Sequence, residues 1–130
     1  MASDSGPEQQ HFKSNYIEVI KRIVPEFYDE TEYNLYGEEE TLKNEISALK
    51  IPTQNIKIFH SNDTVSDKET PLTAIKNSKN TSMWNCVKAQ NDGEADISLS
   101  AGNTGVLLVI SRMILKMMKD VSKPALAGLW

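Results

Sequence analysis

The sequence predicts an α/β fold with three αβα layers around a mainly parallel, Rossmann-like sheet. Segments rich in β-branched and aromatic residues alternate with segments whose apolar residues recur every three or four positions. Stretches rich in Pro, Gly, Asn and Asp separate these segments, as is typical of turns. Because each crossover between parallel strands packs an apolar stripe against the sheet, helices should cover both of its faces.

The first half of the chain predicts a helix, a strand, a second helix and a second strand. Apolar residues at helical spacing predict an amphipathic helix over about residues 11–24, which Pro25 ends. Residues 33–36 have the composition of a short strand. A helix over residues 38–49 opens with three glutamates, which suit the positive end of its dipole. The hydrophobic segment 55–60 predicts the next strand.

A polar loop from residue 61 leads into the second half. Residues 71–76 predict one or two helical turns. Thr81 or Ser82 is a suitable N-cap for a helix that continues to about Asn91. Gly93 then provides the stop, because glycine tolerates the left-handed conformation found there.

The last third is expected to contain strand, helix and strand. The segment ADISLS, residues 95–100, alternates apolar and polar residues and predicts a strand. Residues 106–119 predict a helix that is apolar on most faces and therefore buried. Residues 123–129 would begin a further strand.

Composition limits the function classes. The chain has 130 residues, of which 39% are hydrophobic and 25% charged, which suits one globular domain with a modest core. A net charge of −4 argues against a nucleic-acid partner, which requires a basic face. A single cysteine fits a reducing cytoplasm, where we expect the protein. The longest apolar stretch, residues 106–118, is interrupted by charges and is shorter than a membrane span requires.

A glycine-rich turn, SAGNTG, lies between the last predicted strand and the long apolar helix. In an open α/β sheet such a turn presents backbone N–H groups at a positive helix terminus, where anions bind. Gly102 and Gly105 allow positive φ and close approach of a ligand, and Asn103 tolerates the left-handed region. Ser100 and Thr104 add hydroxyl groups, so phosphate is the expected ligand. The alternative is a tight connection whose glycines only let the helix pack.

Other polar and sulfur-containing residues have a functional and a structural interpretation. His60, at a predicted strand end, is a candidate general acid or base, but packing explains it equally simply. Cys86 is expected to be a small apolar core residue, since no thiol is needed. The methionines at 113, 117 and 118 suit a core or an interface better than a lipid site. A dinucleotide site is disfavoured, because the turn lacks Gly-x-Gly-x-x-Gly spacing.

Several motifs together resemble the bacterial phosphate acyltransferases, the acyl-carrier-protein:phosphate transacylases of fatty acid and phospholipid synthesis. The turn is similar to the family's Ser-Ala-Gly-Asn-Thr-Gly-Ala-Leu motif, with Val106 as the one change. Residues 1–7 resemble Met-Gly-Gly-Asp-x-Gly-Pro with both early glycines replaced. Weaker similarities lie at residues 60–71, 79–83, 93–96 and 124–127.

The resemblance implies an isocitrate/isopropylmalate-dehydrogenase-like fold of the phosphotransacetylase type. It implies transfer of a fatty acyl group from acyl carrier protein to inorganic phosphate, with no cofactor and no metal. Phosphate is itself the nucleophile, so the protein must hold the dianion and stabilise the developing oxyanion. The implied partners are acyl carrier protein, phosphate, a second copy in a homodimer and, peripherally, a membrane acyltransferase.

The candidate site follows from these motifs. The phosphate or oxyanion cradle is expected at Ser100, Gly102, Asn103, Thr104 and Gly105, with Asn103 and Thr104 as catalytic candidates.

Three further residues come from the flanking motifs. Lys79 would add positive charge if its loop folds over the crevice. Asp4, within the early motif, would act through water or orient Lys79, and Gly6 supports that loop. Asp4 as a plain helix cap and Lys79 as a solvated cation are the alternatives.

Relatives in the family are longer, so the chain is expected to be the N-terminal portion of one domain without its first strand and C-terminal part. We therefore expect the isolated chain to have low stability and little transacylase activity, which an acyl phosphate assay on purified protein checks. Two alternatives are a non-catalytic anion-binding fragment and a phosphate acetyl- or butyryltransferase-like enzyme using coenzyme A.

Overall fold

The computed structural model describes residues 31–128 as parts of two compact units, one ending at His60 and the other beginning at Ser61. Each unit is described by itself. The helix predicted over residues 11–24 lies outside the described residues.

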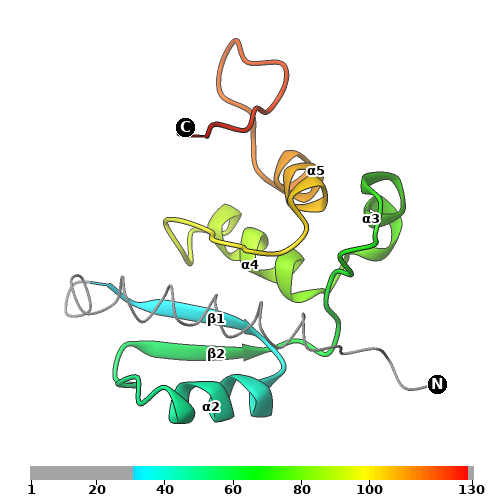
Figure 1. Ribbon diagram of the computed structural model, residues 1–130. Helices are drawn as coiled ribbons and strands as arrows, with labels where there is room; N and C mark the ends of the chain where they lie inside the picture. The colour runs from blue at the N-terminus through cyan, green and yellow to red at the C-terminus, as the bar shows by residue number, and fades with distance from the viewer. Residues whose placement is uncertain (1–30, 129–130) are drawn as a thin grey trace. The chain divides into compact units, whose positions relative to one another are not determined.

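The first unit is a strand, a helix and a strand (Figure 1). Strand β1 (Tyr33–Gly37) pairs in parallel with β2 (Ile56–His60), and helix α2 (Glu39–Ala48) connects them. The register places Tyr33 opposite Ile56 and Gly37 opposite His60. The predicted strands and the helix are thus confirmed to within about a residue at most ends, and the parallel pairing supports the α/β class.

The two faces of this sheet differ. Ile46 of α2 and Ile51 after it are buried against apolar side chains of both strands, among them Leu35 and Ile58. Because side chains alternate along a strand, Tyr36 and Phe59 lie on the opposite face, where their rings stack with centroids 5.0 Å apart. The described part of the unit therefore has one helix-covered face, and coverage of both faces stays a prediction.

Glutamates form the start of α2, as the sequence predicts. The Glu38 carboxylate caps the helix by accepting the backbone N–H groups of Glu40 and Thr41, at 3.1 and 2.7 Å. Hydrogen bonds from the Thr41 hydroxyl and amide hold the pKa of Glu38 below its ordinary value. Glu39 and Glu40 fill the first turn, where the helix dipole favours negative charge.

The second unit contains three helices, and no strand is present among its described residues (Figure 1). Helices α3 (Pro71–Asn77) and α4 (Ser82–Asn91) both pack against α5 (Thr104–Ile114). The buried residues of its core cluster come from all three helices and are Ala74, Met83, Val87, Val106 and Ile110. Thr81 is the N-cap of α4, which confirms one of the two predicted caps.

Two predicted strands of this unit are wrong, and one predicted helix ends earlier than expected. Residues 95–100 form no strand, and Ile97 and Leu99 are 81% and 57% exposed. A strand needs a ladder of hydrogen bonds to another strand, whereas this segment lies beside α4, where the Ser98 hydroxyl donates to the Cys86 carbonyl at 3.1 Å. Residues 123–128 are also irregular. Helix α5 ends at Ile114 rather than near residue 119, because the chain turns extended at Leu115 (ψ 144°) and the residues beyond are exposed.

Two helices end in the same Schellman arrangement with different residues at the left-handed position. At the end of α2, Lys50 has φ 52°, and the Ile51 N–H donates to the Ile46 carbonyl at 3.2 Å. At the end of α4, Gly93 has φ 79°, and the Glu94 N–H donates to the Ala89 carbonyl at 2.9 Å. The predicted role of Gly93 is confirmed, whereas Lys50 holds a conformation that disfavours a side chain.

These two positions should respond oppositely to substitution. We expect Lys50→Gly to stabilise the first unit by about 0.5–1 kcal/mol, because glycine relieves the left-handed strain. Gly93→Ala should destabilise the second unit by about 1 kcal/mol, although an added Cβ at Gly93 would meet no atom within 4 Å. Urea unfolding measures both changes. The stability of Gly93→Asn should lie between those of Gly93→Ala and wild type, because asparagine tolerates the left-handed region better than alanine. Stability changes of the same sign and size for Lys50→Gly and Gly93→Ala would contradict the conformational explanation.

Candidate functional site

Asn103 is the N-cap of α5. Its Oδ1 accepts the backbone N–H of Val106 at 3.1 Å, and its carbonyl accepts the N–H of Leu107 at 2.9 Å. Its φ of −58° and ψ of 108° lie in the ordinary extended range. The expectation that Asn103 uses the left-handed region is therefore wrong, and capping is the reason for an asparagine here.

The same side chain holds a distant loop. Asn103 Nδ2 lies 3.2 Å from the carbonyl oxygen of Ser66, 3.3 Å from that of Asp67 and 2.9 Å from that of Glu69. These three acceptors gather around one amide group that has two hydrogens to donate. Both ends of the Asn103 side chain are thus engaged by the protein, and its structural function is to fix the start of α5 against residues 66–69.

The two glycines of the turn serve packing. Among the described glycines only Gly93 has positive φ, so Gly102 and Gly105 do not use the conformation expected of them. A Cβ on Gly102 would lie 3.0 Å from Met83 Cε and 3.4 Å from Ser100 Oγ. A Cβ on Gly105 would lie 3.4 Å from Pro71 Cγ, an ordinary contact. The absence of a side chain at Gly102 lets the turn lie against the first turn of α4, as the packing alternative expects.

The backbone amides of the turn are partly used. The Gly102 N–H donates to Ser100 Oγ at 3.2 Å, and Val106 is capped by Asn103. The N–H groups of Thr104 and Gly105 have no acceptor among residues 31–128. Thr104 is exposed and Gly105 is half-buried. These two amides, at the positive end of an eleven-residue helix, are the donors left for an anion.

Lys79 lies in the turn between α3 and α4. It is exposed and makes no ion pair within the described part of the chain. The turn around it is held firmly, because the buried Thr81 donates through its hydroxyl to the Ser78 carbonyl at 2.6 Å. Asn80 takes a left-handed φ of 70°. Lys79 lies shortly before α4, the helix whose Met83 side chain packs against Gly102.

The other predicted site residues are His60, Asp4 and Gly6. His60 ends β2 in the first unit, where its Nδ1 accepts the backbone N–H of Glu39 at 3.1 Å. This bond gives His60 a role at the start of α2. Asp4 and Gly6 lie outside the described residues.

Cysteine and metal chemistry find no support in the described residues. Cys86 is half-buried, and burial raises the pKa of its thiol, although a hydrogen bond with Ser98 opposes the shift. A raised pKa leaves little thiolate at neutral pH, so the thiol is a poor nucleophile. Within residues 31–128 no three acidic, histidine or cysteine side chains are grouped to hold a metal ion. No helix in that range is long and apolar enough to cross a membrane.

A family model described as fatty acid synthesis protein matches residues 1–130. The chain belongs to this family. A phosphate acyltransferase of Pelagibacter ubique (strain HTCC1062) is 38% identical over 136 aligned residues, which cover 100% of this chain and 36% of the relative. A phosphate acyltransferase of Streptococcus pneumoniae (strain Hungary19A-6) is 37% identical over 110 residues, covering 85% of this chain and 32% of the relative.

The chain therefore spans about a third of the length of the curated relatives that it matches. The turn at residues 100–105 is the region that the sequence predicts as the site. In the structure it leads into α5, and Ser100 and Asn103 accept backbone N–H groups there. What sequence reasoning missed is the bond between Asn103 and residues 66–69. An asparagine directly before an apolar helix is an N-cap signal, but nothing in the sequence indicates the distant loop.

Proposed function

We propose that the chain forms the phosphate-holding part of an enzyme of fatty acid and phospholipid synthesis. The enzyme transfers an acyl group from the thioester of acyl carrier protein to inorganic phosphate. Membership of the fatty acid synthesis family and relatives named phosphate acyltransferase support this assignment. The structural observation that carries it is the pair of unused backbone N–H groups at the start of α5.

The geometry of that helix start suits a phosphate dianion. The Thr104 and Gly105 amides point out of the first turn, where the helix dipole adds partial positive charge. Asn103 occupies the cap without blocking these two amides, because its oxygen accepts from Val106 instead. The Thr104 hydroxyl is exposed and adds a third donor.

The reaction needs positioning and charge stabilisation rather than a protein nucleophile. A phosphate oxygen attacks the thioester carbonyl carbon, a C–O bond forms, and the carbonyl oxygen becomes an oxyanion. Collapse breaks the C–S bond and releases acyl phosphate and the carrier thiolate, which then takes up a proton. Backbone amides that the fold holds in place stabilise the developing oxyanion without reorganising during the reaction. This preorganisation is the largest contribution of such sites to the rate.

We assign the individual roles as follows. Thr104 and Gly105 bind phosphate through their amides, and Lys79 supplies positive charge from the turn before α4. Asn103 is a positioning residue, because its amide group is already committed to residues 66–69. Ser100 supports the turn by accepting the Gly102 N–H. Gly102 provides the space that Met83 occupies.

A proline at position 104 tests the amide directly. Proline suits the first position of a helix, has no N–H, and already occupies that position in α3 as Pro71. Asn103, with ψ 108°, is close to the conformation that a residue before proline requires. Thr104→Pro should therefore keep the fold while removing one phosphate donor. Thr104→Ala, which keeps the amide and loses only the side chain, is the matched control.

The measurement is stabilisation by inorganic phosphate in thermal unfolding, with chloride at equal ionic strength as reference. For wild type, phosphate at one hundred times its Kd should stabilise the folded state by about 2.7 kcal/mol. Thr104→Ala should keep part of this stabilisation. Thr104→Pro should bind phosphate at least about tenfold more weakly than Thr104→Ala. Equal affinity in the two variants would overturn the role of the amide. Formation of acyl phosphate, trapped as the hydroxamate, then tests the transfer itself.

A further inference from the structure

The segment between β2 and α3, residues 61–70, is polar except for Val65. Val65 is half-buried and packs against the core cluster of the second unit. Two residues earlier, the Asp63 carbonyl accepts the backbone N–H of Ser82 at 2.9 Å, and Asp63 also forms an isolated parallel bridge with Thr81. The segment is therefore fixed against the start of α4 and the core before it turns toward α3.

Residues 66–69, which we call the carbonyl turn, bring backbone oxygens together. The Glu69 N–H donates to the Ser66 carbonyl at 3.0 Å, and the Lys68 N–H donates to Ser66 Oγ at 3.2 Å. With the turn held in this way, three of its carbonyl oxygens lie between 2.9 and 3.3 Å from Asn103 Nδ2. The fit to Asn103 thus depends on where the backbone of the carbonyl turn lies.

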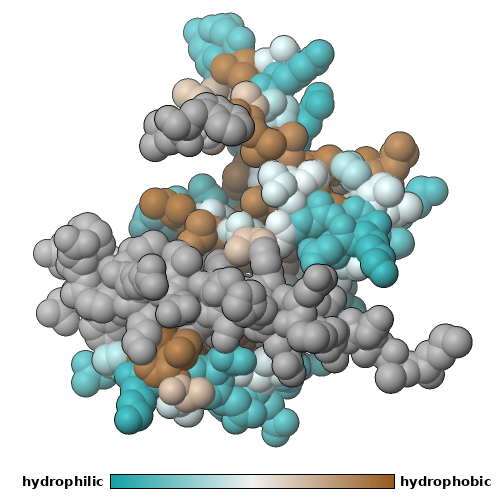
Figure 2. Space-filling model, in the orientation of Figure 1, coloured by the Kyte–Doolittle hydropathy of each residue, from teal (hydrophilic) through white to brown (hydrophobic). Residues whose placement is uncertain are grey.

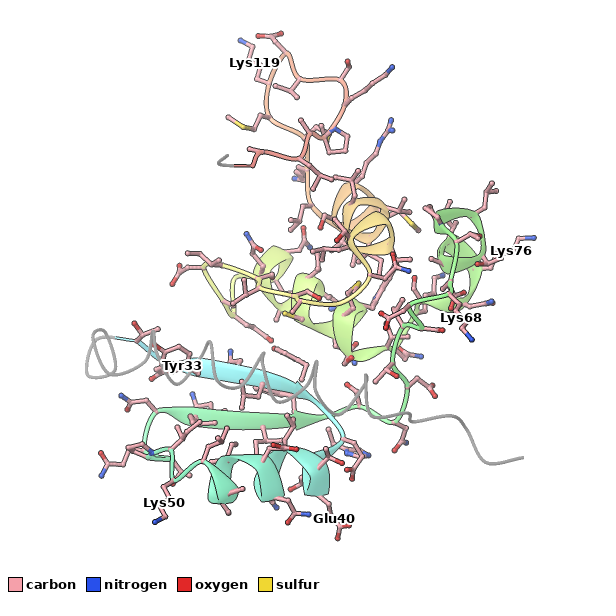
Figure 3. The ribbon with its side chains drawn as sticks, viewed as in Figure 1. Tyr33, Glu40, Lys50, Lys68, Lys76 and Lys119 are labelled. Atoms are coloured by element: carbon pink, nitrogen blue, oxygen red, sulfur yellow. The ribbon has the colours of Figure 1, made fainter. Side chains whose placement is uncertain are left out.

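The carbonyl turn has no buried side chain of its own. Ser66, Asp67 and Lys68 are exposed, and Glu69 is half-buried. Figure 3 shows the Lys68 side chain extending outward, and Figure 2 shows mainly hydrophilic surface beside α3, where the turn lies. The apolar side chain nearest in sequence that packs against the core is Val65, directly before the turn.

Asn103 transmits the position of the carbonyl turn to the start of α5. Its Oδ1 caps the helix at Val106, so its position sets the course of the first helical turn, which includes the amides of Thr104 and Gly105. If the carbonyl turn shifted, Asn103 would either lose its hydrogen bonds to the turn or move with it. Either change would disturb the two amides.

We propose that Val65 is a positioning residue for phosphate binding, acting through the carbonyl turn and Asn103. This inference rests on the proposed function, because it concerns the amides assigned there to phosphate. Val65 is branched at Cβ and has few rotamers, so its contact with the core leaves the turn that follows little freedom. Displacements of about 1 Å are enough to weaken a positioned site strongly. Truncation of Val65 should therefore weaken phosphate binding in protein that is still folded.

Two variants of Val65 and one control test the proposal. Val65→Ala removes the contact with the core, and Val65→Ile is the conservative variant, because it keeps a branched apolar side chain. Leu115→Ala is the matched control, since Leu115 is also half-buried against the same core cluster but lies at the C-terminal end of α5. The Kd for inorganic phosphate is read from the amide NMR signals of Thr104 and Gly105, with chloride at equal ionic strength. Far-UV circular dichroism checks that each variant is folded at the temperature used.

We expect Val65→Ala to raise the phosphate Kd at least about fivefold, and Val65→Ile and Leu115→Ala to change it less than about twofold. Asn103→Ser keeps a cap for α5 but cannot reach the carbonyl turn. In an Asn103→Ser background, Val65→Ala should therefore have no further effect on the Kd. Equal effects of Val65→Ala and Leu115→Ala would overturn the proposal, and so would an undiminished effect of Val65→Ala in the Asn103→Ser background.

The amide signals recorded without phosphate separate this inference from the proposed function. Val65→Ala should shift the Thr104 and Gly105 signals even then, whereas Leu115→Ala should leave them in place. If wild type bound no phosphate but these shifts were seen, the phosphate role would be removed and Val65 would remain a determinant of the start of α5. If wild type and Val65→Ala bound phosphate equally well, the positioning role alone would be removed. Absence of both phosphate binding and the shifts would remove both.

Discussion

Asn103→Ala is expected to lower the free energy of unfolding of the second unit by about 2–3 kcal/mol. The substitution removes the N-cap of α5 and the amide group that holds the carbonyls of Ser66, Asp67 and Glu69. A lost cap typically costs about 1 kcal/mol, and each lost hydrogen bond costs about as much again. Phosphate stabilisation should fall too, because the start of α5 would lose its fixed position.

Two further variants separate the cap from the loop contact. Asn103→Ser keeps an acceptor for the Val106 N–H but cannot reach residues 66–69, so about half of the loss should be recovered. Aspartate is as good a cap as serine, yet Asn103→Asp places a carboxylate among three carbonyl oxygens. Asn103→Asp should therefore be less stable than Asn103→Ser at neutral pH. An Asn103→Asp protein as stable as wild type would show that the loop contact contributes nothing.

Ile110→Ala is expected to cost about 3–4 kcal/mol, the largest loss from any single core truncation in this unit. Ile110 is completely buried, and it packs with Val106 of its own helix and with core residues of α3 and α4. Removing three carbon atoms there leaves a cavity that three helices would have to collapse to fill. The loss should appear as a lower urea midpoint with an unchanged slope.

The chain provides a reporter for this measurement. Its two tryptophans are Trp84 and Trp130, so in a Trp130→Phe background all tryptophan fluorescence comes from α4. Trp84 packs against the core that contains Ile110. Ile110→Val should cost only about 1 kcal/mol, and Met113→Ala, at a position 45% exposed on the same helix, still less. Similar losses at Ile110 and Met113 would contradict the assignment of the core.

The local elements were predictable because their signals lie within a few residues. The helix from Glu39, the parallel strands and the helix capped by Thr81 follow from periodicity, capping residues and prolines. The failures depend on distant partners. Residues 95–100 alternate like a strand, but they lie beside helix α4, and alternation alone forms no sheet without a paired strand.

The candidate site stays a prediction, and the contacts of its residues could not be predicted from the sequence. The glycines and the asparagine of the turn pointed to the start of α5, where two unused amides are found. Their individual roles depended on what packs against them, namely Met83 against Gly102 and residues 66–69 against Asn103. Such neighbours come from tertiary structure, which one sequence does not specify locally.

The hydrogen bonds of Asn103 link residues 34 to 37 positions apart and enclose α3 and α4 within that span. Contacts so far apart in sequence form only after the entropy of closing the intervening chain has been overcome. We therefore expect α3 and α4 to form first and the start of α5 to be fixed against residues 66–69 last. If the start of α5 holds phosphate as proposed, phosphate would bind only after this contact has formed, and the anion would then stabilise the completed unit rather than any earlier stage of its folding.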